Sequence, residues 1–165
     1  MGQTKPVNTN GKFLLVGDTV QELAKDIMLV YQDSKEVYWF GTWQNGVYSY
    51  DGNYLIHYSE KHGLQSNRID EIKEDEFGNL FFVALHPTAS ITKFDGQSFS
   101  KMILTESTDW KLQDKDIWIR NAYQTEKVIR YDGKIFHELT LARPKHLQMP
   151  FEIYSIYKDS RGNLW

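Results

Sequence analysis

The sequence predicts an all-β protein made of β-propeller blades, each with four antiparallel strands. Aromatic residues make up 15% of the chain, with 5 Trp, 10 Tyr and 9 Phe, and large flat side chains favour pleated surfaces. Three sets of residues recur along the chain at one common period, and an aromatic-Asp-Gly triplet marks a turn in each repeat. Four short strands in every ~40–45 residues are typical of one propeller blade.

The common period is the stronger of the two signals. The members of each recurring set lie 42 and then 84 residues apart, so the second gap is twice the first. Three sets that share this spacing are hard to obtain by chance. They are Ile27, Ile69 and Ile153; Asp33, Asp75 and Asp159; and Trp39, Phe81 and Trp165.

The aromatic-Asp-Gly triplet occurs at residues 50–52, 94–96 and 131–133, with spacings of 44 and 37 residues. The third repeat is therefore shorter than the others. It is also irregular, because residues 110–114 lack the apolar alternation of a strand.

The second repeat illustrates the expected order of elements. A first strand leads to Asp75, and the Gly-Asn pair at 78–79 supplies a tight turn. A second strand follows at 80–84, a third at 91–94 ends at the aromatic before Asp-Gly, and a fourth comes after that turn. Residues 19–30 could be drawn as a helix, but the repeat through Ile27 favours a strand over their second half.

We expect residues 1–165 to form one partial propeller domain. The expected segments are 10–18 as the outer strand of an earlier blade, 26–58, 69–103 and 109–139 as complete blades, and 153–165 as the start of a further blade. A propeller closes with roughly four to eight blades. The chain is therefore interpreted as a fragment, with four-blade closure or pairing of two chains as alternatives. The set Trp39, Phe81 and Trp165 is expected in the core.

Composition argues against several functions. The net charge is -3, from 19 basic and 22 acidic residues that are interspersed, so no basic stripe is available for nucleic acid. Cysteine is absent, and the 5 His show no zinc spacing. His57 and His137 are expected in outer strands as ordinary surface histidines with no acid nearby. The aspartates of the turns are expected to bind backbone N–H groups rather than calcium. We expect no metal, no cofactor, no signal peptide and no membrane span in this chain.

Several runs carry a family resemblance: 39–42 (Trp-Phe-Gly-Thr), 46–52, 63–69, and the Ile-x-x-Asp-x-x-Gly-Asn-Leu-Trp pattern that ends at Trp165. They resemble the two-component regulator propeller repeat, from about residue 11 onward. The resemblance implies a non-catalytic, carbohydrate-sensing module of a bacterial two-component regulator. It also implies a periplasmic or other extracytoplasmic location, although the chain carries no signal peptide. Any kinase activity would belong to parts outside this chain.

Strand alternation places the loops after the second and fourth strands of each repeat on one face. These loops carry Trp, Tyr, Asn, Gln, Arg and His, which suit sugar rings because aromatic faces stack on C–H surfaces and amides bind hydroxyls. The predicted ligand-binding residues are Trp43, Gln44, Asn45, Asn67, Arg68, His86 and Tyr123. The simpler interpretation is structural, with Trp43 covering the core and Arg68 donating to a neighbouring carbonyl.

The expected partners are a glycan or small-molecule ligand and either further blades or another copy of the chain. Two other functions compete with the sensor. One is a propeller-type lyase or hydrolase, which would need His and Glu converging on the central face, where these loops offer only His86 and His146. The other is a structural fragment with no activity of its own.

Overall fold

The computed structural model describes residues 16–111, 113–121, 124, 126–142, 156, 159, 161, 163 and 165. Their regular structure is β-strand apart from one turn of 3-10 helix, so the all-β prediction is confirmed. The chain divides into two compact units. The first contains the described residues up to 84 together with 91–101, and the second contains 85–90 and the described residues from 102 onward.

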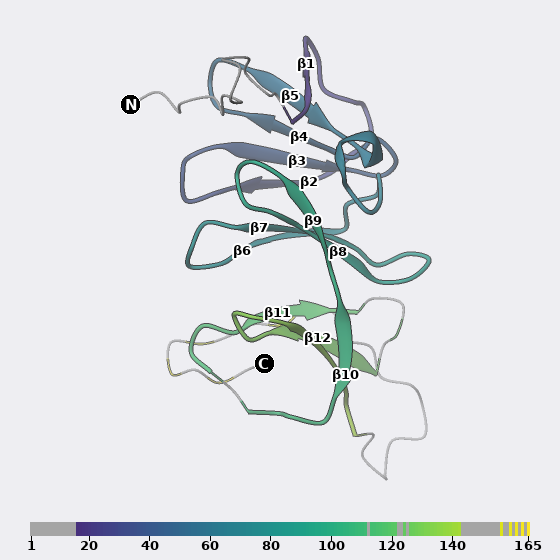
Figure 1. The fold of residues 1–165 in the computed structure, drawn as a ribbon, viewed down its shortest axis with the longest axis vertical. Helices are drawn as coiled ribbons and strands as arrows, with labels where there is room; N and C mark the ends of the chain where they lie inside the picture. The colour runs from purple at the N-terminus through teal and green to yellow at the C-terminus, as the bar shows by residue number, and fades with distance from the viewer. Residues whose placement is uncertain are drawn as a thin grey trace. The chain divides into compact units, whose positions relative to one another are not determined.

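The first unit begins with a five-stranded antiparallel sheet (Figure 1). In spatial order its strands are β1 (Asp18–Val20), β5 (Leu55–Tyr58), β4 (Val47–Tyr50), β3 (Tyr38–Thr42) and β2 (Ile27–Gln32). The predicted earlier-blade strand at 10–18 overlaps this sheet only at Asp18, which pairs with His57 of β5, and residues 10–15 lie outside the described part. The strand preference at Ile27 is confirmed by β2.

The second sheet follows the order of the sequence. It consists of β6 (Glu71–Glu74), β7 (Leu80–Ala84), β8 (Ser90–Phe94) and β9 (Phe99–Met102). Apart from Ser90 and Met102, these residues belong to the first unit. Every residue of β7 is buried. A strand buried on both faces reads as a continuous apolar run, which is why Leu-Phe-Phe-Val-Ala shows no alternation in the sequence.

The two sheets of the first unit pack face to face and share one apolar core (Figure 1). Trp39 of β3 lies at its centre, with 4% of its surface exposed. Its ring centroid is 5.4 Å from that of Phe82, and 5.7 Å from those of Tyr58 and Phe94. Aromatic pairs at these separations add to the stabilisation that burial alone gives.

Asp33 joins this core to the turn between β2 and β3. Its Oδ1 accepts the backbone N–H groups of Lys35 and Val37, each at 2.9 Å. Its Oδ2 accepts the indole N–H of Trp39 at 2.8 Å. The polar edge of a buried tryptophan thus has a partner, and the same carboxylate fixes the turn.

The other two aspartates of the set close their turns in the same way. Asp75 and Asp159 each accept backbone N–H groups from the residues two and four positions later, at 2.9–3.0 Å. The backbone-binding role predicted for these aspartates is therefore confirmed. It also holds at the Asp-Gly turns, where Asp51 Oδ1 accepts the N–H groups of Asn53 and Tyr54.

The core prediction is confirmed for Trp39 and Phe81 but wrong for Trp165. Phe81 is fully buried, whereas Trp165 is 75% exposed. The indole of Trp165 still donates to Asp159 at 3.1 Å, as Trp39 does to Asp33. The residues described beside it, 159, 161 and 163, form no strand whose sheet could cover the ring. The local turn is thus repeated at Trp165 without the packing.

A second contact between the sheets lies at Glu74 of β6. Its carboxylate accepts Tyr31 Oη–H at 3.3 Å, and both the backbone N–H (2.9 Å) and the hydroxyl (2.5 Å) of Ser34. Burial is the main cause that raises the pKa of Tyr31 to about 12, followed by the charge of Glu74. The phenol therefore keeps its proton and holds the edge strand β2 to β6.

The second unit contains β10 (Leu104–Ser107), β11 (Ile117–Arg120), β12 (Lys127–Tyr131) and β13 (Phe136–Thr140). Its sheet has the order β10-β13-β12-β11, and β10 runs parallel to β13. The prediction of four antiparallel strands is therefore wrong for this sheet. The cause is the irregular segment identified in the sequence: residues 109–111 and 113 form no strand, and a fourth strand is added at the opposite edge instead.

Arg130 of β12 occupies the interior of this unit, and 2% of its side chain is exposed. It donates to the carbonyl of Lys111, and its nitrogens lie 3.9 Å from carboxylate oxygens of Asp109 and Asp116. Among the described residues, Arg130 Nε and Asp116 Oδ1 have no hydrogen-bond partner. The segment that replaces a strand thus surrounds a buried cation with oxygen atoms.

We predict that Trp39→Ala lowers the free energy of unfolding by about 3–5 kcal/mol, because it leaves a large cavity between the sheets. Trp39→Phe should lose about 1–3 kcal/mol, since it leaves Oδ2 of the buried Asp33 without its indole donor while keeping most of the packing. Urea denaturation measures both. The control is Tyr38→Ala, which removes a 43% exposed ring from the same strand. Equal losses for Trp39→Ala and Tyr38→Ala would contradict the central role of Trp39.

A second prediction concerns Tyr31. Its pKa is raised from 10.0 to about 12 in the folded protein, so its contribution to stability is present below pH 10 and is lost as the pH rises toward 12. Burial also raises the pKa of Tyr48 and Tyr58. The loss due to Tyr31 is therefore isolated by comparison with Tyr31→Phe, which should keep a larger share of its pH 8 stability at pH 11. Identical pH profiles by chemical denaturation would refute this.

Candidate ligand-binding site

Five of the seven predicted site residues lie together at one end of the first unit. They come from the β3–β4 loop and from the segment that leads from β5 to β6 through η1 (Glu60–His62). The two segments are joined by backbone hydrogen bonds, from Gly46 N–H to Asn67 O at 2.6 Å and from Ile69 N–H to Thr42 O at 2.9 Å. The loops that follow the second and fourth strands of this repeat therefore meet, as expected from strand alternation.

Trp43 and Arg68 form the centre of this site. The Arg68 Cζ lies 3.8 Å from the centroid of the Trp43 ring, a cation–π distance. Arg68 Nε donates to Asp70 Oδ1 at 2.7 Å, and only 16% of the arginine side chain is exposed. Trp43 keeps 45% of its surface exposed. The structure thus pairs the two residues with each other and Arg68 with a carboxylate.

Asp26 fixes the polar residues next to Trp43. Its carboxylate accepts the backbone N–H of Gln44 at 2.9 Å and the side-chain amide of Asn45 at 2.8 Å. Its backbone carbonyl accepts the N–H of Trp43 at 3.0 Å. Burial acts to raise the pKa of Asp26, but the hydrogen bonds from Asn45 and Gln44 outweigh it and lower that pKa. A charged Asp26 thus anchors the loop.

Gly46 ends the loop in a conformation that few other residues could adopt. Its φ is +73°, and a Cβ there would lie 2.1 Å from the carbonyl oxygen of Tyr58. Thr42 adds a second constraint, because its hydroxyl donates to Gly46 O and accepts the N–H of Asn45, each at 2.8 Å. The loop is therefore held from both ends before any ligand binds.

Asn67 connects the loop to η1. Its backbone N–H donates to Glu60 Oε1 at 3.1 Å, and its Oδ1 accepts the backbone N–H of Glu60 at 3.0 Å. This reciprocal pair uses the side-chain oxygen of Asn67. Asn67 therefore positions the loop in the structure. The side-chain NH₂ group of Asn67 is what it would offer a ligand.

The other two predicted residues are not part of this cluster. His86 is exposed on the loop 85–90, which belongs to the second unit, and Tyr123 lies outside the described residues. The sequence analysis missed Asp26, Glu60 and Asp70. Asp70 lies two residues after Arg68, a spacing that could have suggested their ion pair, whereas Asp26 and Glu60 give no local signal because their partners lie 18 and 7 residues away.

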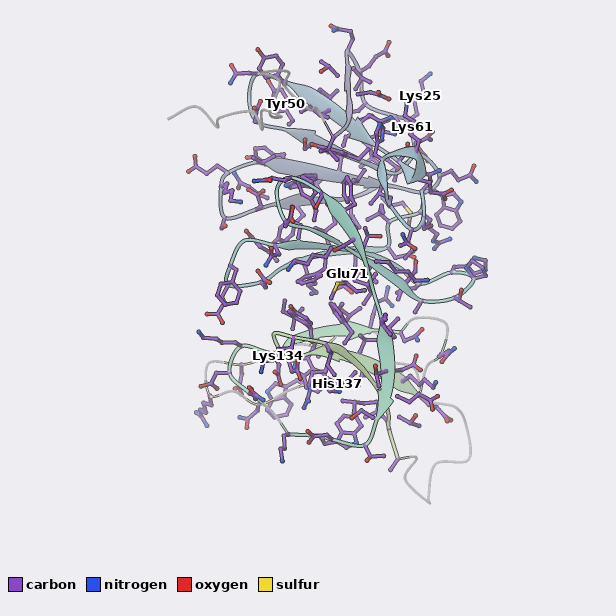
Figure 2. The ribbon with its side chains drawn as sticks, viewed as in Figure 1. Lys25, Tyr50, Lys61, Glu71, Lys134 and His137 are labelled. Carbon is purple, nitrogen blue, oxygen red and sulfur yellow. The ribbon has the colours of Figure 1, made fainter. Side chains whose placement is uncertain are left out.

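One histidine prediction is corrected in the second unit. The sequence analysis treats His137 as a surface residue with no acid nearby, but it is 9% exposed, and its Nε2 lies 2.8 Å from Asp132 Oδ2 (Figure 2). The hairpin between β12 and β13 returns the chain onto its own turn aspartate. Burial acts to raise the pKa of Asp132, but the hydrogen bonds from the Ile135 backbone and from His137 outweigh burial and lower that pKa to about 2.

The described part of the chain contains no group of three or more His, Cys, Asp or Glu side chains placed to hold a metal ion. It also contains no helix long and apolar enough to cross a membrane.

We predict that Arg68→Ala lowers the free energy of unfolding by about 1–2 kcal/mol, because it removes a partly buried charge-assisted hydrogen bond and a cation–π contact. The Trp43 indole resonance should shift in NMR spectra. The control is Lys73→Ala, whose ion pair with Glu71 (2.8 Å) is more exposed, and which should change stability by less than about 1 kcal/mol. An unchanged Trp43 resonance in Arg68→Ala would contradict the stacking.

The chain was compared with protein-family models and with curated proteins. No protein-family model matches the chain. No curated protein matches it either. The functional interpretation therefore depends on the geometry of the cluster and on the repeats in the sequence.

Proposed function

We propose that this chain is a run of propeller blades that acts as a non-catalytic glycan-binding sensor module. The resemblance to the two-component regulator propeller repeat supports the sensor role, with signalling in parts outside this chain. The observation that carries the proposal is the half-exposed Trp43 ring, backed by an Arg68 that Asp70 holds in place.

The packing of the first two sheets supports a stack of blades. Trp39 and Phe81 are equivalent positions in the repeat, and so are the next residues, Phe40 and Phe82. Adjacent residues on a strand face opposite sides. The shared core uses Trp39 from the first sheet but Phe82 from the second. Each sheet thus contributes a different face, and such head-to-tail packing can be repeated from sheet to sheet, as it is in a propeller.

The chemistry of the cluster suits a sugar. An indole ring offers a flat apolar face to the C–H groups of a pyranose, while the amides of Gln44 and Asn45 can bind hydroxyl groups at its edge. Asp26 and Gly46 hold the loop in one conformation before binding. A preorganised loop loses little entropy when a ligand binds, so a modest contact area is sufficient.

The charges of the cluster favour a neutral glycan over an anionic one. Arg68 contacts the Trp43 ring directly, and Asp70 already neutralises it at 2.7 Å. Asp26 and Glu60 add two further carboxylates nearby. Uronates and sulfated sugars would therefore meet a surface with excess negative charge, which disfavours them.

The test is calorimetric titration of the protein with a panel of neutral and anionic oligosaccharides. We expect binding of a neutral member, and at least a tenfold loss in Trp43→Ala, equivalent to about 1.4 kcal/mol. The matched control is Trp110→Ala, because Trp110 is similarly exposed (40%) and belongs to the second unit. If Trp43→Ala binds as tightly as the wild type, the proposed site is wrong. If no oligosaccharide of the panel binds the wild type, the glycan proposal is refuted.

A further inference from the structure

We propose that protonation of His62 loosens the contact between the β3–β4 loop, which carries Trp43, and the segment after η1, which carries Arg68. Acid would thereby regulate the candidate site. The loosening itself follows from the geometry of η1. Only its effect on ligand binding rests on the proposed function. Lys61, labelled in Figure 2, marks the position of η1 in the first unit.

The hydrogen bonds of His62 determine which ring nitrogen carries the proton. The backbone N–H of Ser59 points at His62 Nδ1 over 2.9 Å. A backbone N–H can only donate, so Nδ1 must carry a free lone pair. The ring proton is then on Nε2, which lies 3.7 Å from Asp18 Oδ1. The folded structure thus requires a neutral His62 in one tautomer.

A second proton on Nδ1 would face the Ser59 N–H and break this bond. η1 is a single turn in which Glu60 and Lys61 are exposed. Its packing comes from the His62 ring, which lies 6.4 Å from the ring of Tyr58. Its remaining supports are the Ser59 cap and the left-handed Gly63, whose N–H donates to Glu60 O at 3.0 Å. A single helical turn is unstable without such bonds, because nucleation is unfavourable.

The consequence reaches the site through Glu60 and Asn67. These two residues exchange two hydrogen bonds, and both use atoms whose positions η1 determines. Asn67 O in turn accepts the N–H of Gly46 at 2.6 Å, and Arg68 is the next residue along the chain. Loss of the turn at η1 therefore weakens one support of the Trp43–Arg68 stack, the bond from Gly46 N–H to Asn67 O, while Asp26 and Asp70 still hold the two residues.

The groups around His62 determine the direction of the pH dependence. Asp18 of β1 faces it at 3.7 Å and is itself paired with Lys61. From β5, the rings of His57 and Tyr58 lie 6.3 Å and 6.4 Å from its own. Burial is the main cause that lowers the pKa of His62 below 6.5. Asp18 opposes this shift, while Lys61 and His57 add to it. His62 is therefore neutral at pH 7.5, and the support is lost as the pH falls below 6.5.

The experiment is hydrogen exchange by NMR on the full chain without ligand, at pH 7.5 and pH 5, corrected for intrinsic rates. In the wild type we expect protection of the Gly46 and Asn67 amides to fall at least tenfold at pH 5, with a midpoint that coincides with titration of the His62 ring. The core amide of Val83 should keep its protection, which excludes global unfolding.

Two variants separate His62 from its neighbour. His62→Asn places an oxygen where Nδ1 lies and cannot titrate, so its Gly46 amide should be insensitive to pH. His57→Gln keeps a donor for the carbonyl of Asn45, which His57 Nε2 contacts at 2.6 Å, and should respond as the wild type does. A pH response retained in His62→Asn would overturn the proposal, as would a wild-type Gly46 amide that does not change. Because these readouts need no ligand, they can fail independently of glycan binding.

Discussion

The structure of the first unit depends on one carboxylate that serves a turn and the core together. Asp33 fixes the β2–β3 turn with Oδ1 and orients Trp39 with Oδ2, so the ring meets the second sheet in one position. In the second repeat Phe81 has no ring N–H, and Asn79 donates its side-chain amide to Asp75 instead, at 2.7 Å. The hydrogen bond is thus retained where the aromatic residue changes. A buried carboxylate without its donors would be strongly unfavourable, so turn, strand pairing and sheet packing form together.

The candidate site uses the same device at the other end of the strands. Asp26 binds the β3–β4 loop as Asp33 binds the β2–β3 turn, with a carboxylate that accepts two N–H groups. Asp70 plays the corresponding part for Arg68, and a buried guanidinium needs such a partner. The exposed Trp43 is then presented by a loop whose backbone is already satisfied. Binding surfaces on rigid scaffolds are commonly built in this way, because the scaffold bears the ordering entropy.

Much of the first unit could be predicted because its information is local and repeated. The strands at 27–32 and 80–84, the turns at Asp51 and Asp75, and the meeting of the loops that carry Trp43 and Arg68 follow from periodicity and strand alternation. Contacts between segments without a shared period could not be predicted. These include Glu74 with Ser34 and the closure of the β12–β13 hairpin by His137 on Asp132. The parallel pairing of β10 was also beyond reach, since a sheet edge accepts a strand in either direction and the sequence of β10 does not choose.

The second unit shows what happens when the repeat loses its first strand. A regular first strand there would have paired with the edge of β11, but residues 109, 111 and 113–116 are polar, with Trp110 between them. Arg130 lies on the same sheet face as Trp118, which it pairs with directly across the strands. Its positive charge attracts the polar segment, because the carbonyl oxygen of Lys111 and the carboxylates of Asp109 and Asp116 all lie close to the guanidinium. The two carboxylates remain 3.9 Å away, too far for good hydrogen bonds, so the pairing offsets the desolvation of the arginine only in part. The irregular repeat is therefore held by a weaker interaction than the one that Asp33 and Trp39 provide.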